Sequence, residues 1–194
     1  MENNGPSGIK TAIRKEKLGR RRRMENAEVS LLSRKICERI IASGEYKSAE
    51  NLLIYNHINN EVDLTLLAEH ARGAGKKLAY PLCFSHGEMK AFEPMSDDAF
   101  INGAFGIREP DEKRSRLIEP EEIDLVICPL TAFDERCGRI GMGGGYYDRY
   151  LPKCVNAFIS AAAYEFQKTD RASFEDTDIS VDAVFTESAE YRQR

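Results

Sequence analysis

The sequence predicts a three-layer α/β/α domain with a mostly parallel sheet, because apolar runs of strand type alternate with helical patterns along the chain. The run Leu125-Val-Ile-Cys128 is apolar throughout, as expected for a central strand that is covered on both faces. Between residues 52 and 81, an apolar run, a helical pattern and a second apolar run follow one another, which is typical of a βαβ unit. Ligands bind such sheets outside the carboxyl ends of the strands, so the segments 56–61 and 131–145 mark the expected site.

Two amphipathic patterns predict helices in the first part of the chain. The first begins near Ser7, a residue type that caps the start of helices. The second has Asn26 as its expected cap and Ser43-Gly44 as its expected end. Its apolar residues recur at three- and four-residue steps, at Val29, Leu32, Ile36 and Ile40. This face should pack on the core.

The remaining elements follow from apolar runs and turn signals. A strand is expected at 52–55, a helix ending at Gly73, and a parallel strand at 78–81. The tripeptide Ser85-His-Gly87 predicts a turn, joining residues 82–84 to residues 89–92 in an antiparallel excursion. After the central strand, the patterns predict a helix near 146–154 and further strands at 157–163 and 183–185.

Length and composition place the chain among ordinary globular proteins. Its 194 residues fit one compact domain, 1–194, and its 42% hydrophobic and 31% charged residues are near average. No apolar run approaches the roughly 18–20 residues of a membrane span, and the first seven residues lack the apolar stretch of a secretory signal. We therefore expect a cytoplasmic monomer without a membrane partner.

The net charge and the positions of cysteine and histidine argue against disulfide-rich, zinc-binding and nucleic-acid-binding proteins. The five cysteines and three histidines are scattered without a C-x-x-C pair, which argues against a disulfide framework or a zinc site. A net charge of -4 argues against nucleic acid as the main partner. Residues 20–23, all arginine, are a local exception that fits either a solvated helix face or a partner surface.

The glycine-rich segment 139–148 is the strongest chemical signal. Gly141, Gly143, Gly144 and Gly145 carry no Cβ atom, so successive backbone N–H groups can approach phosphate oxygens. Arg139 adds a fork of donors beside them, and the carboxylate of Asp148 can hold Mg²⁺ against phosphate. The segment is neither a dinucleotide fingerprint nor a Walker A box. A tight structural turn remains the alternative interpretation.

The same segment, Arg-Ile-Gly-Met-Gly-Gly-Gly-Tyr-Tyr-Asp-Arg at 139–149, closely resembles the signature of the 5-formyltetrahydrofolate cyclo-ligases, also called methenyltetrahydrofolate synthetases. Three further segments resemble motifs of that family in the same order: Lys10-x-x-x-Arg14, Glu61-Val-Asp63 and Phe105-Gly-Ile-Arg-Glu-Pro110. The resemblance runs from about Lys10 to Phe185, nearly the whole chain.

The resemblance implies a reaction. Enzymes of this family convert 5-formyltetrahydrofolate to 5,10-methenyltetrahydrofolate, using ATP with Mg²⁺ and releasing ADP and phosphate. Phosphorylation of the formyl oxygen turns a very poor leaving group into phosphate, and N10 then attacks the activated carbon. Catalysis in such phosphoryl transfers is mainly positioning and charge neutralisation.

The resemblance also implies roles for individual residues, with Arg139 and Tyr147 as the catalytic pair. Metal binding falls on Asp148 and Asp182. The implied ATP contacts are Lys10, Arg14, Arg139, Ile140, Gly141, Met142, Gly143, Gly144, Gly145, Tyr146 and Tyr147. The implied folate contacts are Asn56, Glu61, Met89, Phe105, Met142, Gly143, Gly144, Gly145 and Tyr146.

One position departs from some family members, which carry a lysine where this chain has Gly144. Without that cation, neutralisation of the triphosphate depends more on Arg139, Lys10 and Arg14, together with Mg²⁺.

Two other functions stay open. A relative of sugar-phosphate isomerases or acyl-CoA transferases, which have a similar α/β/α architecture, would work without ATP. A non-catalytic descendant would instead bind nucleic acid through residues 20–23.

Overall fold

The computed structural model describes residues 5–103, 106–172 and 178–193. In the described part of the chain, eight strands form one sheet in the order β12-β11-β10-β7-β1-β2-β3-β6. The bounds of these strands are β1 Asn51–Leu53, β2 Lys77–Cys83, β3 Met89–Pro94, β6 Ser115–Ile118, β7 Leu125–Cys128, β10 Phe158–Ala162, β11 Ala183–Phe185 and β12 Glu190–Arg192.

The centre of the sheet is parallel, which confirms the predicted fold class. Strand β1 pairs in parallel with both β2 and β7, and β10 pairs in parallel with β7 and β11. Antiparallel strands complete the two sides: β12 lies beside β11, while β3 and β6 follow β2. The predicted antiparallel excursion is therefore confirmed, with a 3₁₀ turn at Ser85–Gly87 between β2 and β3. Two small antiparallel pairs stand apart, β4 Phe100–Asn102 with β5 Arg108–Pro110, and β8 Ala132–Phe133 with β9 Arg139–Ile140.

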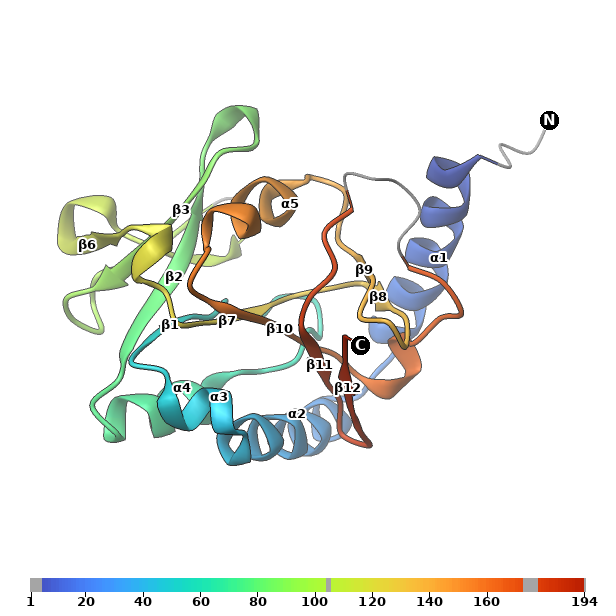
Figure 1. Ribbon diagram of the computed structural model, residues 1–194, viewed down its shortest axis with the longest axis horizontal. Coiled ribbons are helices and arrows are strands. Elements are labelled where there is room, and N and C mark those ends of the chain that lie inside the picture. Colours follow the sequence, from blue (N-terminus) through green and yellow to red (C-terminus); the bar gives the residue numbers. More distant parts are fainter. Residues whose placement is uncertain (1–4, 104–105, 173–177, 194) are drawn as a thin grey trace.

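Helices cover both faces of the sheet. Figure 1 shows α2 (Asn26–Ala42), α3 (Gly44–Ser48) and α4 (Thr65–Gly73) on one face and α5 (Tyr146–Tyr150) on the other. Side chains in the central strands alternate between these layers: Leu52 packs in the cluster under α2 and α4, and Leu53 in the cluster under α5. Both are almost fully buried. This is why the central strands read as continuous apolar runs.

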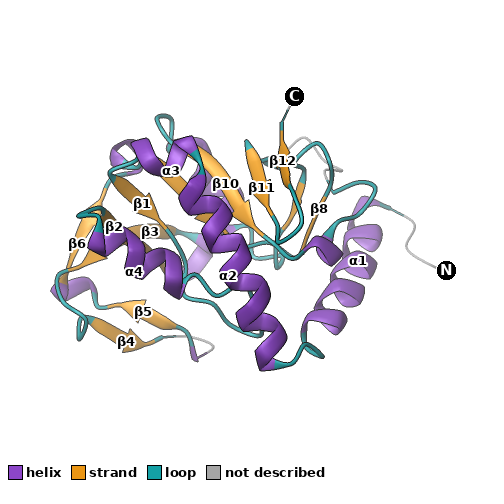
Figure 2. Cartoon of the chain, turned by 90° about the horizontal axis from the view of Figure 1, so that it is seen from below, coloured by secondary structure: helices purple, strands orange, loops and turns teal. Residues whose placement is uncertain are grey.

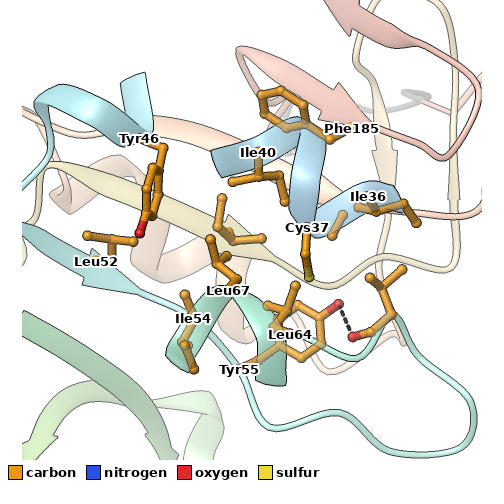
Figure 3. Close-up of a cluster of buried hydrophobic side chains, with 14 of the residues drawn as sticks. Ile36, Cys37, Ile40, Tyr46, Leu52, Ile54, Tyr55, Leu64, Leu67 and Phe185 are labelled. Carbon is orange, nitrogen blue, oxygen red and sulfur yellow. Dashed lines mark hydrogen bonds between the residues drawn. The ribbon is translucent and has the colours of Figure 1, made fainter. Parts of the chain in front are cut away.

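The larger core cluster lies between the sheet and the α2–α4 layer. Figure 3 shows Ile36 and Ile40 from α2 facing Leu67 from α4 and Phe185 from β11. All four side chains are at most 1% exposed. The three- and four-residue spacing in the sequence therefore correctly identified the core-facing side of α2.

Helix starts differ from the sequence predictions. Helix α1 spans Pro6–Arg21 with Gly5 at its N-cap, two residues before the expected cap Ser7. Proline suits the first helical position because its missing N–H would have no helical partner there. Helix α2 has Glu25 at its N-cap, and Asn26 is its first residue. The expected end at Ser43 is confirmed, because Ser43 is the C-cap of α2. Its hydroxyl also accepts a hydrogen bond from Tyr46 N and so caps the start of α3.

The predicted helix near 146–154 is shorter and divided. The α-helix α5 ends at Tyr150, and a 3₁₀ turn, Leu151–Lys153, continues from it. Pro152 explains the change, because it supplies no N–H to an α-helical hydrogen bond. Helix α1 lies away from the two helical layers, beside β8 in both views and with β9 next to it in Figure 1 (Figures 1 and 2). None of the helices in the described residues is long and apolar enough to cross a membrane.

Candidate active site

A pocket of about 1340 Å³ opens at the carboxyl ends of the parallel strands, where the fold class predicted it. Its walls include Tyr55 and Asn56 after β1, Cys83 at the end of β2 and Pro129 after β7. Ligand pockets typically measure about 300–1,000 Å³. The volume therefore leaves room for two ligands side by side.

The glycine-rich loop forms one wall of this pocket. It connects β9 to α5, and every residue from Arg139 to Arg149 lines the cavity. Gly143 has φ 104° and Gly145 φ 66°, the left-handed region that residues with a side chain avoid. Glycine at these two positions is thus required by the loop conformation. Because α5 is only five residues long, the helix dipole contributes less to anion binding here than the sequence pattern suggested.

Helix α1 brings two cations to the loop. The Nε atom of Arg14 donates a hydrogen bond of 2.8 Å to Gly141 O, so the guanidinium lies against the loop backbone. Lys10 is buried and lines the same cavity. Its Nζ lies 2.5 Å from Asp178 Oδ1. The predicted pairing of Lys10 and Arg14 on one helical face is therefore present, and both cations reach the pocket.

Arg139 is the most deeply buried cation of the loop. Its side chain is 2% exposed and its Nη2 atom lies 2.5 Å from Asp148 Oδ1. Its guanidinium stands 5.9 Å from the centre of the Tyr147 ring. Within the described residues, Arg139 Nε and the Tyr147 hydroxyl are buried without hydrogen-bond partners. Buried polar groups are usually paired, so unpaired groups at a pocket wall fit a ligand that would pair with them.

Burial raises the pKa of Tyr147 well above its usual value. The hydroxyl therefore keeps its proton near neutral pH. It can donate a hydrogen bond to a ligand oxygen, but it is not suited to accept a proton as a base. The role left to Tyr147 in the predicted catalytic pair is that of a hydrogen-bond donor.

The predicted metal ligands do not come together. Asp148 lines the pocket, but Asp182 does not. Asp182 precedes β11 at the amino end of the strands, and its Oδ2 accepts a hydrogen bond of 2.8 Å from Ile159 N. In a parallel sheet the amino ends of the strands lie at one edge and the carboxyl ends at the other. Asp182 therefore lies at the edge opposite the pocket. The structure instead places Asp178 in the pocket. Within the described residues, no cluster of three or more histidine, cysteine or acidic side chains is arranged as a metal site.

Three of the predicted folate contacts outside the glycine-rich loop line the same pocket. Asn56, Glu61 and Met89 all line it. The Nδ2 atom of Asn56 donates to Arg108 O at 2.6 Å, which ties the segment after β1 to β5. Met89 is 4% exposed and therefore serves the core as well as the pocket. Phe105 lies outside the described residues.

Glu61 is a buried carboxylate at the pocket wall, 7% exposed. Burial raises its pKa, while the nearby guanidinium of Arg21 acts in the opposite direction. Oε1 of Glu61 lies 3.4 Å from Arg21 Nη2, and Oε2 accepts a hydrogen bond of 3.2 Å from Ile58 N. A carboxylate held in this way accepts hydrogen bonds from N–H donors of a ligand.

The arginine run at 20–23 is not one continuous surface. The Arg20 guanidinium lies 4.4 Å from the centre of the Phe166 ring, and Arg21 is 2% exposed. Arg22 and Arg23 are exposed. Arg20 is exposed as well, so of the four arginines only Arg21 belongs to the buried packing of α1 and cannot be part of a solvated face or a partner surface.

Sequence reasoning missed several pocket residues. Asp178 and Ile179 follow a stretch without apolar periodicity, and no local signal could have identified them. Arg108 and Glu109 also line the pocket, and here a signal existed, because both belong to the segment 105–110 that was recognised as a motif. Only the fold shows that these segments meet.

The fold and the pocket together define an α/β enzyme whose cavity combines a glycine-rich loop with buried cations and carboxylates. The chain belongs to the 5-formyltetrahydrofolate cyclo-ligase family, whose model matches residues 6–187. This confirms the resemblance found in the sequence.

Individual relatives agree with this assignment. A probable 5-formyltetrahydrofolate cyclo-ligase of Schizosaccharomyces pombe is 31% identical over 121 residues, which cover 61% of this chain and 59% of that protein. The 5-formyltetrahydrofolate cyclo-ligase of Escherichia coli K12 is 27% identical over 173 residues, covering 87% of this chain and 95% of that protein. The solved structure of 5,10-methenyltetrahydrofolate synthetase from Aquifex aeolicus matches with a TM-score of 0.84 at 33% identity, covering 96% of this chain and 93% of that chain.

Proposed function

We propose that the protein converts 5-formyltetrahydrofolate to 5,10-methenyltetrahydrofolate and consumes ATP with Mg²⁺ in doing so. One observation carries the proposal: a single cavity is lined both by the glycine-rich loop with its cations and by the buried carboxylate Glu61. The loop and its cations suit a polyphosphate, and the Glu61 carboxylate suits the N–H donors of a pterin ring. The cavity is large enough for both ligands.

The phosphate half of the site rests on charge. Lys10, Arg14 and Arg139 all line the pocket, so three cations can neutralise the triphosphate without the lysine that some relatives carry at position 144. A side chain at Gly144 would also crowd the Tyr146 ring, since a Cβ built there comes within 2.9 Å of it. These residues would bind and orient ATP with its γ-phosphate toward the folate.

Magnesium fits the carboxylates that line this half of the pocket. Asp148 and Asp178 supply the oxygen ligands that Mg²⁺ prefers, and each already lies beside a cation, Arg139 and Lys10 respectively. The metal, when bound, neutralises charge on the transferring phosphoryl group. Asp178 takes the place that Asp182 had in the sequence prediction.

The proposed reaction balances without a further reactant. The formyl oxygen attacks the γ-phosphorus and ADP leaves, N10 then attacks the activated formyl carbon and releases its proton to solvent, and phosphate departs with the original oxygen. Arg139 and the protonated Tyr147 would hydrogen-bond the phosphoryl oxygens, because their buried Nε and hydroxyl groups lack other partners among the described residues. Positioning, rather than covalent catalysis by the protein, would supply the rate.

The deciding experiment mixes the protein with 5-formyltetrahydrofolate, ATP and Mg²⁺ and follows the near-ultraviolet absorbance of the methenyl product. We expect product only when both ATP and Mg²⁺ are present, with one ADP released per product. Product formed without ATP would contradict the proposal and favour the isomerase or transferase alternative. Folded protein that forms no product in any mixture would refute the enzyme activity.

A further inference from the structure

Arg21, the last residue of α1, is buried behind the pocket wall without lining the cavity. It is 2% exposed, and its guanidinium makes two contacts. The Nε atom donates a hydrogen bond of 3.0 Å to Asn59 O, and Nη2 lies 3.4 Å from Glu61 Oε1. The planar fork of arginine can serve two acceptors at once, which the single point charge of lysine does less well. Both acceptors belong to the segment that carries Glu61.

The segment 58–61 is a tight turn with an unusual backbone. Asn59 has φ 50° and Asn60 φ 59°, so two successive residues with side chains occupy the left-handed region. Glu61 closes the turn through its own backbone, which donates to Ile58 O at 2.9 Å. The Nδ2 atom of Asn60 donates to Arg21 O at 3.0 Å. The turn therefore depends on the end of α1 for support.

The backbone beyond Glu61 is anchored separately in the core. The Tyr55 hydroxyl donates to Val62 O at 3.1 Å, the dashed contact in Figure 3. The Tyr164 hydroxyl donates to Glu61 O at 3.2 Å. These bonds fix the main chain but leave the direction of the carboxylate open. Only Arg21 Nη2 and Ile58 N contact the carboxylate oxygens among the hydrogen bonds of the described residues.

The pairing of Arg21 with Glu61 stabilises the fold because both side chains are buried. A buried carboxylate is costly unless it is paired, and a buried guanidinium has the same requirement. Glu61 and Arg21 satisfy each other, and the carboxylate remains at the pocket wall while Arg21 stays behind it. A carboxylate with a firmly held orientation binds a planar row of N–H donors better than one that turns freely.

We propose that Arg21 is the positioning residue of the folate half of the site, holding the turn 58–61 and aiming the Glu61 carboxylate without touching the substrate. The inference rests on the proposed function, because it assumes that Glu61 receives the folate. It also gives α1 a second task. Lys10 and Arg14 serve the phosphate half, and Arg21 follows Arg14 by two helical turns on the same face. One helix thus aligns both ligands.

The test compares Arg21→Gln with Arg22→Gln, a matched change at the exposed neighbour. Equilibrium binding of 5-formyltetrahydrofolate, without ATP, gives Kd, and steady-state kinetics gives KM for each substrate. We expect Arg21→Gln to raise Kd and KM for the folate by roughly 10- to 100-fold, as for loss of a hydrogen bond to a charged group, while KM for ATP changes little. Arg22→Gln should leave all three constants unchanged.

A pH series separates positioning from general damage to the fold. The groups that act on the Glu61 carboxylate are Arg21 and His57, with the Tyr55 and Tyr147 hydroxyls nearby. Without Arg21, Glu61 should take up a proton at higher pH, so the loss of folate affinity on acidification should begin earlier than in wild type. Arg22→Gln retains the same His57 and should follow wild type.

Two further variants keep the inference falsifiable if Arg21→Gln folds poorly. Arg21→Lys should recover part of the folate affinity, since it restores the charge but not the fork. In a Glu61→Gln background, Arg21→Gln should add little further loss, because the carboxylate it positions is gone. Unchanged folate affinity in Arg21→Gln, or equal losses for folate and ATP, would overturn the inference. Wild type that binds folate but forms no product would refute the proposed reaction alone, and the binding constants would still decide the role of Arg21.

Discussion

Replacing Arg139 by methionine removes a buried positive charge from the glycine-rich loop while nearly preserving the side-chain volume. The Arg139 side chain is 2% exposed, so water screens it little, and it lies 2.5 Å from Asp148. At an effective dielectric constant of about 20, two unit charges about 4 Å apart attract each other by roughly 4 kcal/mol. A phosphoryl oxygen held at the unpaired Nε would feel an attraction of this order.

The expected kinetic effect follows from that attraction. Loss of one preorganised donor at a developing charge costs about 2.7–4 kcal/mol, or roughly 10²–10³-fold in kcat. Because Gly144 supplies no cation in this chain, we expect the upper end of that range for Arg139→Met. Arg139→Lys should lose less, since it keeps the charge and loses only the fork of donors.

The assay is methenyl product formation at saturating 5-formyltetrahydrofolate and ATP, with ADP release measured in parallel. Arg136→Met is the matched control, because Arg136 is exposed in the turn between β8 and β9. Urea unfolding of each variant must show that the fold survives. A folded Arg139→Met protein with nearly normal turnover would refute the catalytic role of Arg139.

Three further predictions concern stability, each measured by urea unfolding. Gly145→Ala forces a side chain into the left-handed region and should cost about 1–2 kcal/mol, whereas Gly73→Ala meets open space and should cost nothing; equal effects would contradict the backbone argument. Burial raises the pKa of Cys37 to about 12 and that of Cys128 to about 11, from the ordinary 9.0. Their contribution to stability should be complete below pH 9 and lost as pH rises through 9 toward 11 or 12; a flat profile across that window would be the contrary result. Leu67→Ala, at a side chain with no exposed surface, should cost about 2–5 kcal/mol, and a loss under 1 kcal/mol would mean that the core collapses around the cavity.

The fold could be predicted to the extent that local patterns determine it. The apolar run at 125–128 is the central strand β7, and the alternation of strand and helix predicted the mostly parallel sheet but not the order of its strands. The pair β8 and β9 was missed because each strand has only two residues, too few for any periodicity. Yet this pair carries Arg139 into the pocket. Irregular structure next to a site has no sequence pattern of its own.

The candidate site could be predicted where a motif was contiguous. The glycine-rich loop was identified from the sequence, and all of it lines the cavity. Asp178 could not be identified, since it is brought to Lys10 across 168 positions of the chain. Asp182 was assigned a metal role from its motif, but the direction of β11 places it at the opposite edge of the sheet. Choosing between the two aspartates needs the fold.

Helix α1 also bears on when the cavity comes into being during synthesis. It is synthesised before its partners, because Arg14 pairs with Gly141, 127 positions later, and Lys10 pairs with Asp178, 168 positions later. At about 5–20 residues per second, roughly ten to thirty seconds separate the making of Lys10 from that of its partner. A nascent chain can thus build much of its parallel sheet well before it can hold a nucleotide. The proposed turnover of ATP would therefore begin only on chains that have been synthesised past Asp178.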